Sequence, residues 1–246
     1  MSLVIDIGNT TIHFGIFGKD KLIKNFKVET HCNASLQIIK LIKNNFKIHP
    51  NKIIICSVVP KETIRLKKNL KQIFKINPII VGRDLVVPIK NLYLKPKQVG
   101  QDRLVNAYAG VAFYGSPLIV VDFGTAITFD IISKNKEYLG GMILPGLNMS
   151  LEALGQKTAL LPKVKLTKPK EFIGRDTKQS ILSGIVYGFS AMTDNLTERI
   201  KTKIGKNAKI IATGGNTDLV SKFSNNINVV DKNLTLKGLN LLAQLR

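Results

Sequence analysis

The chain has 246 residues, and 44% of them are hydrophobic, which is enough to bury a core in one large domain or two small ones. No apolar run approaches the ~18 residues that a membrane span needs, and the beginning of the chain lacks the basic-then-apolar pattern of a signal peptide. The 2 cysteines, Cys32 and Cys56, cannot form a disulfide framework and lack the spacing of a metal site. We therefore exclude a membrane-spanning or disulfide-rich protein and expect a reduced, cytoplasmic one with no membrane partner.

The chain is strongly basic, with 37 Lys and Arg against 16 Asp and Glu and a formal net charge of +21 at pH 7. This balance is compatible with nucleic-acid binding, and it would also attract an anionic substrate. However, the lysines are dispersed, and some share a predicted helix face, as Lys67, Lys68, Lys71 and Lys75 do. We interpret the charge as a solvated basic surface, and nucleic acid is not the expected partner.

The first half of the chain predicts three antiparallel strands, followed by helix, strand, helix and strand. The helix over residues 61–75 should turn Ile64, Leu70, Ile73 and Phe74 inward. This order of elements is typical of one half of an actin-like, ribonuclease-H-type α/β fold. The expected strands are residues 2–8, 11–17, 21–30, 52–59 and 78–81, and the helix opened by Ser35 has apolar residues at Leu36, Ile39, Ile42 and Phe46.

The first predicted hairpin carries a pattern suited to phosphate binding, Asp6-Ile7-Gly8-Asn9-Thr10-Thr11-Ile12. Gly8 lets the backbone turn sharply and approach a ligand, and the hydroxyls and turn amides can surround phosphate oxygens. A carboxylate at the end of a buried strand, such as Asp6, is costly unless it holds a cation or a hydrogen-bond partner. His13 follows the turn, where it either faces the nucleotide or packs as an ordinary strand residue.

A Pro- and Lys-rich connection, residues 83–98, contains Tyr93 and leads to Gly100-Gln101-Asp102-Arg103 at the start of an apolar helix. Asp102 and Arg103 should lie in the first turn, where free amides and the helix dipole stabilise a carboxylate. An ionised Asp102 can accept a proton from a substrate hydroxyl, and the Arg103 guanidinium suits a carboxylate or phosphate. The alternative is that Asp102 is only a helix cap and Arg103 a surface residue.

The second half begins near Ser116 and repeats the pattern with a hairpin over residues 118–132. Its turn, Asp122-Phe123-Gly124-Thr125-Ala126, echoes the first one. Either copy alone fits an ordinary hairpin, but two copies favour a duplicated domain with a nucleotide between the halves. The expected fold is α/β and actin-like, with domains at residues 1–115 and 116–246 and the active site in the cleft between them.

A long helix from Gln179 to about Lys203 dominates the rest of the second half. Small residues on its surface permit close packing, either in the core or at a dimer seam. Strand 209–212 then leads to a Gly-Gly turn whose free amides can point at a ligand. The apolar helix positions are Ile181, Ile185, Phe189, Met192 and Leu196, and the small ones are Ser183, Gly184, Gly188, Ser190 and Ala191. Residues 137–143 and 227–230 are further expected strands, and residues 234–245 are the last helix.

Taken together, these motifs resemble those of the type III pantothenate kinase family, in the same order and over nearly the whole chain. Any one motif is weak evidence, but the ordered set is specific. The matching segments are Asp6-Ile7-Gly8-Asn9-Thr10, Gly100-Gln101-Asp102-Arg103, Asp122-Phe123-Gly124-Thr125-Ala126, Gly140-Gly141 with Pro145-Gly146, Thr158-Ala159-Leu160-Leu161-Pro162, Gly174-Arg175-Asp176-Thr177 and Thr213-Gly214-Gly215.

The resemblance implies a homodimeric enzyme that phosphorylates pantothenate to 4'-phosphopantothenate with ATP, the first step of coenzyme A biosynthesis. It implies Mg²⁺ and a monovalent cation, K⁺ or NH₄⁺, as cofactors. Carried over by position, Asp102 is the proton acceptor and Asp122 is a ligand of the monovalent cation. The implied ATP-binding residues are Asp6, Ile7, Gly8, Asn9, Thr10, Thr11, Ile12, His13 and Thr125. The implied pantothenate-binding residues are Tyr93, Gly100, Gln101, Asp102, Arg103 and Thr177. Gln101 departs from the small or apolar residue usual in this family.

Three other interpretations stay open. The chain fits an actin-like kinase for another small hydroxy acid or a sugar, which would differ only in the acceptor pocket. The +21 charge also allows a nucleic-acid-binding or transcription accessory protein on the same scaffold. A catalytically inactive homologue is the third, and the complete motif set argues against it.

Overall fold

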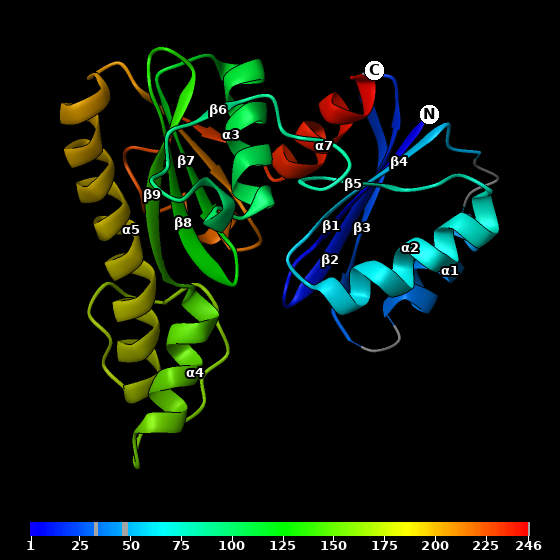
Figure 1. Ribbon diagram of the computed structural model, residues 1–246. Helices are drawn as coiled ribbons and strands as arrows, with labels where there is room; N and C mark the ends of the chain where they lie inside the picture. Colours follow the sequence, from blue (N-terminus) through cyan, green and yellow to red (C-terminus); the bar gives the residue numbers. More distant parts are fainter. Residues whose placement is uncertain (32–33, 46–48, 246) are drawn as a thin grey trace. The chain divides into compact units, whose positions relative to one another are not determined.

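The computed structural model describes residues 1–31, 34–45 and 49–245 (Figure 1). The chain divides into two compact units: unit 1 is Met1–Ile89, Lys95–Ala109 and Asn233–Arg246, and unit 2 is Lys90–Leu94 and Gly110–Lys232. Relative to the expected boundary after residue 115, three segments are grouped differently: residues 110–115, residues 90–94 and the last helix. The segment 90–94 joins unit 2 because it pairs with a strand there. The last helix joins unit 1 because it packs on the first sheet.

The sheet of unit 1 has the strand order β3-β2-β1-β4-β5. Apolar runs form its central strands because both faces are covered. The strands are β1 (Ser2–Ile7), β2 (Thr11–Gly18), β3 (Lys21–Glu29), β4 (Lys52–Ser57) and β5 (Ile79–Ile80). The helices are α1 (Ala34–Asn45), α2 (Pro60–Phe74), the 3₁₀ turn η1 (Pro96–Gln98), α3 (Gln101–Tyr114), whose last turn belongs to unit 2, and α7 (Leu234–Gln244).

The two faces of this sheet have different coverings. On one face, Ile5, Phe14 and Ile55 are fully buried with Ile38 of α1 and Leu66 of α2. The other face is covered by α7, which contacts β1, β2 and β4. Hydrogen bonds from Asn25 to Asn233 Oδ1 (2.7 Å) and from Ser2 to Asn240 Oδ1 (2.6 Å) fix α7 on this side.

The inward face of α2 differs in part from the prediction. Leu70 is fully buried and Phe74 packs against the core as expected, but Ile64 is 71% exposed, so its predicted position was wrong. The buried stripe instead runs through Glu62, Leu66 and Leu70, one residue per turn. In α1, Ile42 is buried as expected, whereas Phe46 and Cys32 lie outside the described residues.

The sheet of unit 2 has the order β11-β10-β7-β8-β9-β6. Its strands are β6 (Lys90–Asn91), β7 (Leu118–Phe123), β8 (Ala126–Ile132), β9 (Glu137–Pro145), β10 (Lys209–Thr213) and β11 (Val229–Val230), and its helices are α4 (Leu147–Lys157), α5 (Thr177–Ile204) and α6 (Thr217–Val220). Figure 1 shows α5 as a long helix with α4 beside its first turns, and the two are in contact.

The two sheets repeat one topology. In unit 1, β1 is antiparallel to β2 and parallel to β4, and in unit 2, β7 is antiparallel to β8 and parallel to β10. The third strand of each unit continues the antiparallel side, and the short last strand continues the parallel side. This equivalence confirms the duplication that the two Asp-containing hairpins predicted.

The long helix α5 buries one side and exposes small residues on another. Ser183 and Ser190 are buried, whereas Gly184, Gly188 and Ala191 are exposed. Within the described residues, no helix combines the length and apolar character needed to cross a membrane. The dimer seam expected on this helix stays a prediction.

Candidate active site

The first Asp-containing hairpin of unit 1 is held by its neighbouring strand. The Gly8 amide donates to the Thr11 carbonyl (3.0 Å), which closes the turn. From the end of β3, the Thr30 amide donates to the Thr10 carbonyl and the Thr30 hydroxyl donates to the Gly8 carbonyl, both at 2.8 Å. The turn that would surround phosphate oxygens is therefore fixed on two sides, so little ordering is required on binding.

Asp6 lies in a row of polar side chains across the sheet. It is opposite His13 on β2 and opposite Cys56 on β4, and opposite residues project from the same face of a sheet. Burial, and secondarily the positive charge of Lys27, lowers the pKa of His13 from 6.5 to about 4. The imidazole is therefore neutral at physiological pH and can hydrogen-bond without adding charge.

Asp102 lies in the first turn of helix α3, as the sequence predicted. Its Oδ1 accepts a hydrogen bond from the Arg103 amide (2.9 Å). A Cβ on Gly100 would lie 2.4 Å from this same oxygen, so only glycine permits the observed carboxylate position. The Arg103 side chain is buried, which excludes the alternative that it is a surface residue.

The pKa of Asp102 is raised above its usual value of 3.8, chiefly by burial. The Arg103 amide and the Arg103 positive charge act in the opposite direction but do not outweigh burial. The pKa of the Cys56 thiol is also raised well above its usual range, by burial and then by the charges of Asp6 and Asp102. Asp6, Cys56 and Asp102 therefore form one electrostatically coupled group within unit 1, and the raised pKa makes Asp102 a stronger proton acceptor.

The departure from the family pattern at Gln101 has a structural counterpart. The Gln101 side chain lies directly on the backbone of Gly82, where a Cβ would come within 2.5 Å of Gln101 Cδ. Gly82 also has φ +82°, a conformation that side-chain-bearing residues rarely adopt. The longer side chain at position 101 is thus accommodated by a glycine on the loop after β5.

The second hairpin, in unit 2, brings three of the predicted motifs together. A Cβ on Gly214 would lie 2.4 Å from Asp122 Oδ1, so the Gly214-Gly215 turn packs directly on this carboxylate. The Gly146 amide donates to the Thr125 carbonyl (3.1 Å), so the Pro145-Gly146 break supports the turn from the other strand. Asp122, Thr125 and the two glycine turns thus form one compact cluster.

The Tyr93 side chain packs against a bulge in strand β9. The register of β8 and β9 shifts between Ile131 and Ile132, and Gly140 there has φ +130°. The Tyr93 ring lies over Gly140, with Cδ2 3.4 Å from the position a Cβ would take. The Leu92 amide donates to the Tyr138 carbonyl (2.9 Å), and the Tyr93 amide donates to Asn91 Oδ1 (3.0 Å). These contacts give the ring a defined position in unit 2.

Thr177 is the first residue of α5 and is exposed. Asp176 caps the helix, since its side chain accepts a hydrogen bond from the Gln179 amide (2.7 Å). The loop before it is tied to the helix by Ser180, whose hydroxyl donates to the Gly174 carbonyl (3.2 Å). The free amides of this helix start are available to an anionic group of a ligand.

The predicted site residues fall into two groups, each assembled within one unit. Unit 1 holds residues 6–13 and 100–103, and unit 2 holds Tyr93, Asp122, Thr125 and Thr177. Sequence reasoning missed Thr30, Cys56 and Gly82 because each joins the site through long-range pairing. Only the strand order, which places Cys56 opposite Asp6, could have identified the thiol.

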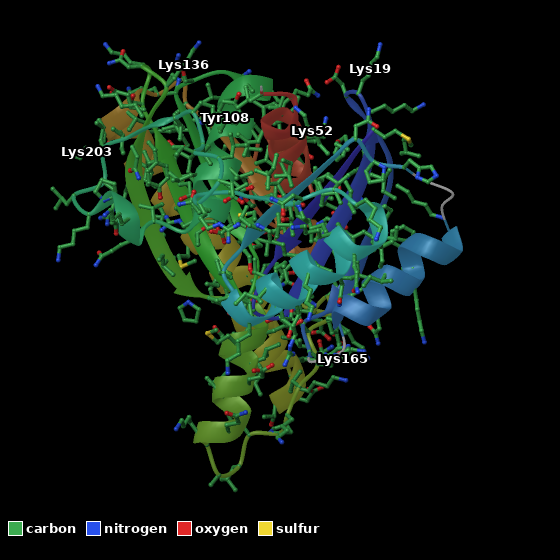
Figure 2. The ribbon with its side chains drawn as sticks, turned by 45° about the vertical axis from the view of Figure 1, so that its right-hand side comes forward. Lys19, Lys52, Tyr108, Lys136, Lys165 and Lys203 are labelled. Carbon is green, nitrogen blue, oxygen red and sulfur yellow. The ribbon has the colours of Figure 1, made fainter. Side chains whose placement is uncertain are left out.

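The basic charge is spread over separate elements. Lys19 lies at the turn between β2 and β3, Lys136 at the turn between β8 and β9, and Lys203 near the end of α5 (Figure 2). In the described part of the chain, no three His, Cys, Asp or Glu side chains are grouped as a metal site. Asp122 could therefore hold a cation only together with backbone carbonyls or ligand oxygens.

The family model described as type III pantothenate kinase matches residues 2–199. A solved structure from Campylobacter jejuni, described as a Baf family transcriptional activator, is 23% identical with a TM-score of 0.59 and covers 98% of this chain and 96% of its own. The Clostridium difficile activator of 2-hydroxyisocaproyl-CoA dehydratase, with bound ADPNP, is 11% identical with a TM-score of 0.56 and covers 98% and 92%.

A third structure, from Sinorhizobium meliloti and described as a 2-dehydro-3-deoxygalactonokinase, is 11% identical with a TM-score of 0.56 and covers 99% of this chain and 98% of its own. At these identities the structures show the fold, which is the actin-like ATPase fold that the sequence predicted.

Proposed function

Because the chain belongs to the type III pantothenate kinase family, we propose that it transfers the terminal phosphoryl group of ATP to the primary hydroxyl of pantothenate, the first step of coenzyme A biosynthesis. One observation carries the proposal most directly. Asp102, with a raised pKa, sits at the start of α3 in the same unit as the Asp6 hairpin, and the two carboxylates both act on the Cys56 thiol. These contacts support the proposal that Asp102 accepts a proton close to a turn that binds phosphate.

Asp102 and Arg103 are proposed to bind and orient pantothenate, the phosphoryl acceptor. The Asp102 carboxylate orients the pantothenate hydroxyl and takes its proton as the oxygen bonds to phosphorus, while the bond to the departing ADP breaks. Arg103 supplies a cation for the carboxylate of pantothenate. Phosphoryl transfer depends mainly on position and charge neutralisation, and a placed carboxylate contributes about 10²- to 10⁴-fold.

The two hairpins are proposed to bind the phosphates of the nucleotide. Residues Asp6 to His13 present turn amides and hydroxyls to the phosphates, and Thr125 does so from the second hairpin. Mg²⁺, when bound with ATP, would neutralise phosphate charge, and Asp6 is the carboxylate placed to hold it directly or through water. The chain's own contribution is a turn already fixed by Thr30.

A monovalent cation, K⁺ or NH₄⁺, is proposed at Asp122. The fit rests on the crowded carboxylate: Gly124 and Gly214 both lack the Cβ that would fill the space beside Asp122 Oδ1. A carboxylate oxygen with neighbouring backbone carbonyls is a suitable donor set for a hard cation. Such a cation would offset phosphate charge beside the second hairpin.

Tyr93 and Thr177 are proposed to contact pantothenate from unit 2, and the enzyme is proposed to be a homodimer. A cavity of about 630 Å³ lies between α4 and α5, with Met149, Leu154, Ile185 and Phe189 in its wall. Met149 on α4 is exposed and the other three side chains are half-buried, and an apolar hollow of this kind suits contact with a second copy.

The decisive experiment measures ADP release with pantothenate and with a panel of other small hydroxy acids and sugars, in K⁺ and in Na⁺ buffers. We expect turnover with pantothenate and more in K⁺. Asp102→Asn should lose at least about tenfold in turnover with ATP affinity retained. Turnover only with another hydroxy compound would show that this compound, and not pantothenate, is the substrate. Unchanged turnover in Asp102→Asn would remove Asp102 from the mechanism.

A second candidate is a transcription accessory role. Two observations favour it: the net charge of +21 and the description of the Campylobacter jejuni protein of the same fold. The test is binding to duplex DNA at two salt concentrations, since phosphate contacts make affinity fall steeply with salt. Strong, salt-dependent binding without pantothenate turnover would favour this role.

A further inference from the structure

We propose that Lys27 on β3 is a binding residue for the nucleotide phosphates, beside the hairpin residues 6–13. The proposal deepens the nucleotide site proposed above and rests on it for the identity of the ligand, a nucleoside di- or triphosphate. It adds a residue outside the motifs on which the family resemblance depends.

The register of the sheet places Lys27 on the face of the nucleotide hairpin. Lys27 is opposite His13 on β2, and His13 is opposite Asp6 on β1. Directly opposite residues project from the same face, so Lys27, His13 and Asp6 form one row. Asn25, two residues earlier on β3, bonds to Asn233 beside α7, which confirms that this face of β3 is the α7 side of the sheet.

The distance along this row is within the reach of a lysine. Adjacent strands are about 4.8 Å apart, so the Lys27 backbone lies roughly 10 Å from that of Asp6. Lysine carries its ammonium on a flexible four-carbon stem, which can extend over His13 toward the turn. Thr30, three residues further on, is bonded to both Gly8 and Thr10, so β3 has a fixed position relative to the turn.

The charge of Lys27 is available to a ligand. The side chain is exposed, and among the described residues it makes no hydrogen bond or ion pair. Lys24 on the same strand lies on the other face, where it stands over the Phe26 ring at 5.2 Å. The nearby carboxylates, Asp6 and Glu29, share the face of Lys27, so an anionic phosphate there requires a cation.

His13 supports this arrangement because it stays neutral. Its pKa is lowered to about 4, first by burial and second by the charge of Lys27, which lies opposite it in the sheet register. A neutral imidazole does not repel the Lys27 ammonium, and its one N–H can still donate to a phosphate oxygen. Lys27 thus supplies a compact positive charge at the edge of the hairpin, as lysines do in other phosphate sites.

The test compares Lys27→Met with Lys24→Met, which removes the same charge from the opposite face of the same strand. Dissociation constants for ATP, ADP and AMP are measured by calorimetry without pantothenate. We expect Lys27→Met to weaken ATP and ADP about tenfold or more and AMP by much less, with Lys27→Arg close to the parent. Lys24→Met should leave all three constants unchanged.

A second readout tests the position of the ammonium independently of any ligand. NMR titration of His13 should show a higher pKa in Lys27→Met than in the parent, and no change in Lys24→Met. Equal ATP affinities in Lys27→Met and Lys24→Met would overturn the proposal. Because binding is measured without the acceptor, a protein that ignores pantothenate but loses ATP affinity in Lys27→Met would refute the proposed kinase reaction and retain the assignment of Lys27.

Discussion

Replacing Gly100 by Ala should displace the carboxylate of Asp102, the proposed proton acceptor, while Asp102 itself is left unsubstituted. A Cβ at this position would lie 2.4 Å from Asp102 Oδ1, and Cβ atoms in proteins essentially never come within 3.0 Å of another heavy atom. Because the obstructed atom is the end of a side chain, we expect the carboxylate to rotate away and the fold to persist. The rotation breaks the 2.9 Å hydrogen bond from the Arg103 amide.

The magnitude follows from that lost bond and from the displacement. A hydrogen bond to a charged acceptor contributes about 1.5–3 kcal/mol, part of which water restores. Displacement of a reacting group by about 1 Å can cost about 10²-fold in rate. We therefore expect kcat to fall about 10- to 100-fold, with the KM for ATP within about twofold of the parent.

The assay is coupled ADP release with saturating pantothenate, and circular dichroism checks folding. Gly184→Ala is the matched control, because a Cβ there meets no atom of the chain within 4 Å; since α5 is also the expected dimer seam, size-exclusion chromatography checks that this variant elutes like the parent. A folded Gly100→Ala enzyme with parental kcat would show that the observed carboxylate position is not the catalytic one.

Two further predictions follow from the described contacts. The raised pKa of Asp102 means that the folded protein binds its proton more tightly than the unfolded chain, so stability decreases as pH rises from 3.8 through the folded pKa. Asp102→Asn should consequently raise Tm at pH 7, and thermal melts that show no gain, or a gain that is greatest in acid, would contradict the assigned shift. Gly140→Ala should raise the KM for pantothenate several-fold with little effect on the KM for ATP, because Gly140 has φ +130° and lies under the Tyr93 ring. Steady-state kinetics with Gly184→Ala as control test this, and equal changes in both KM values would indicate a general loss of structure.

Most of the fold was predictable because its elements are encoded locally. The central strands are apolar runs bounded by turns, and both hairpins were placed within one or two residues of the observed strands. The edge strand β6 was missed, since Lys90 and Asn91 carry no strand pattern and pair with β9 only through the tertiary structure. The ion pair between Lys90 and Glu137 (2.7 Å) supports that pairing, and these two residues are 47 positions apart in the sequence.

The unit boundaries were harder to predict for the same reason. The last helix follows unit 2 in sequence but packs on β1 and β4 of unit 1. The sequence of residues 234–245 does not indicate whether this helix packs on unit 2, which precedes it in the chain, or on unit 1. The position of Ile64 is a local example of this limit: it lies two residues from both Glu62 and Leu66, on the opposite side of the helix from the buried stripe, and faces solvent.

At the candidate site, burial has a larger effect on the pKa of Asp102 than the helix N-terminus has, and the sequence alone did not indicate this. The start of α3 led us to expect a carboxylate stabilised in its charged form, and the Arg103 amide does act in that direction. A helix N-terminus contributes only about 0.3–1 kcal/mol, less than one pKa unit, whereas burial can shift a carboxyl pKa by up to about 3–5 units. Burial is a property of the folded chain that local sequence does not reveal, so the sign of the shift had to come from the structure. The same burial that costs stability raises the basicity of Asp102, which is the property that a proton acceptor requires.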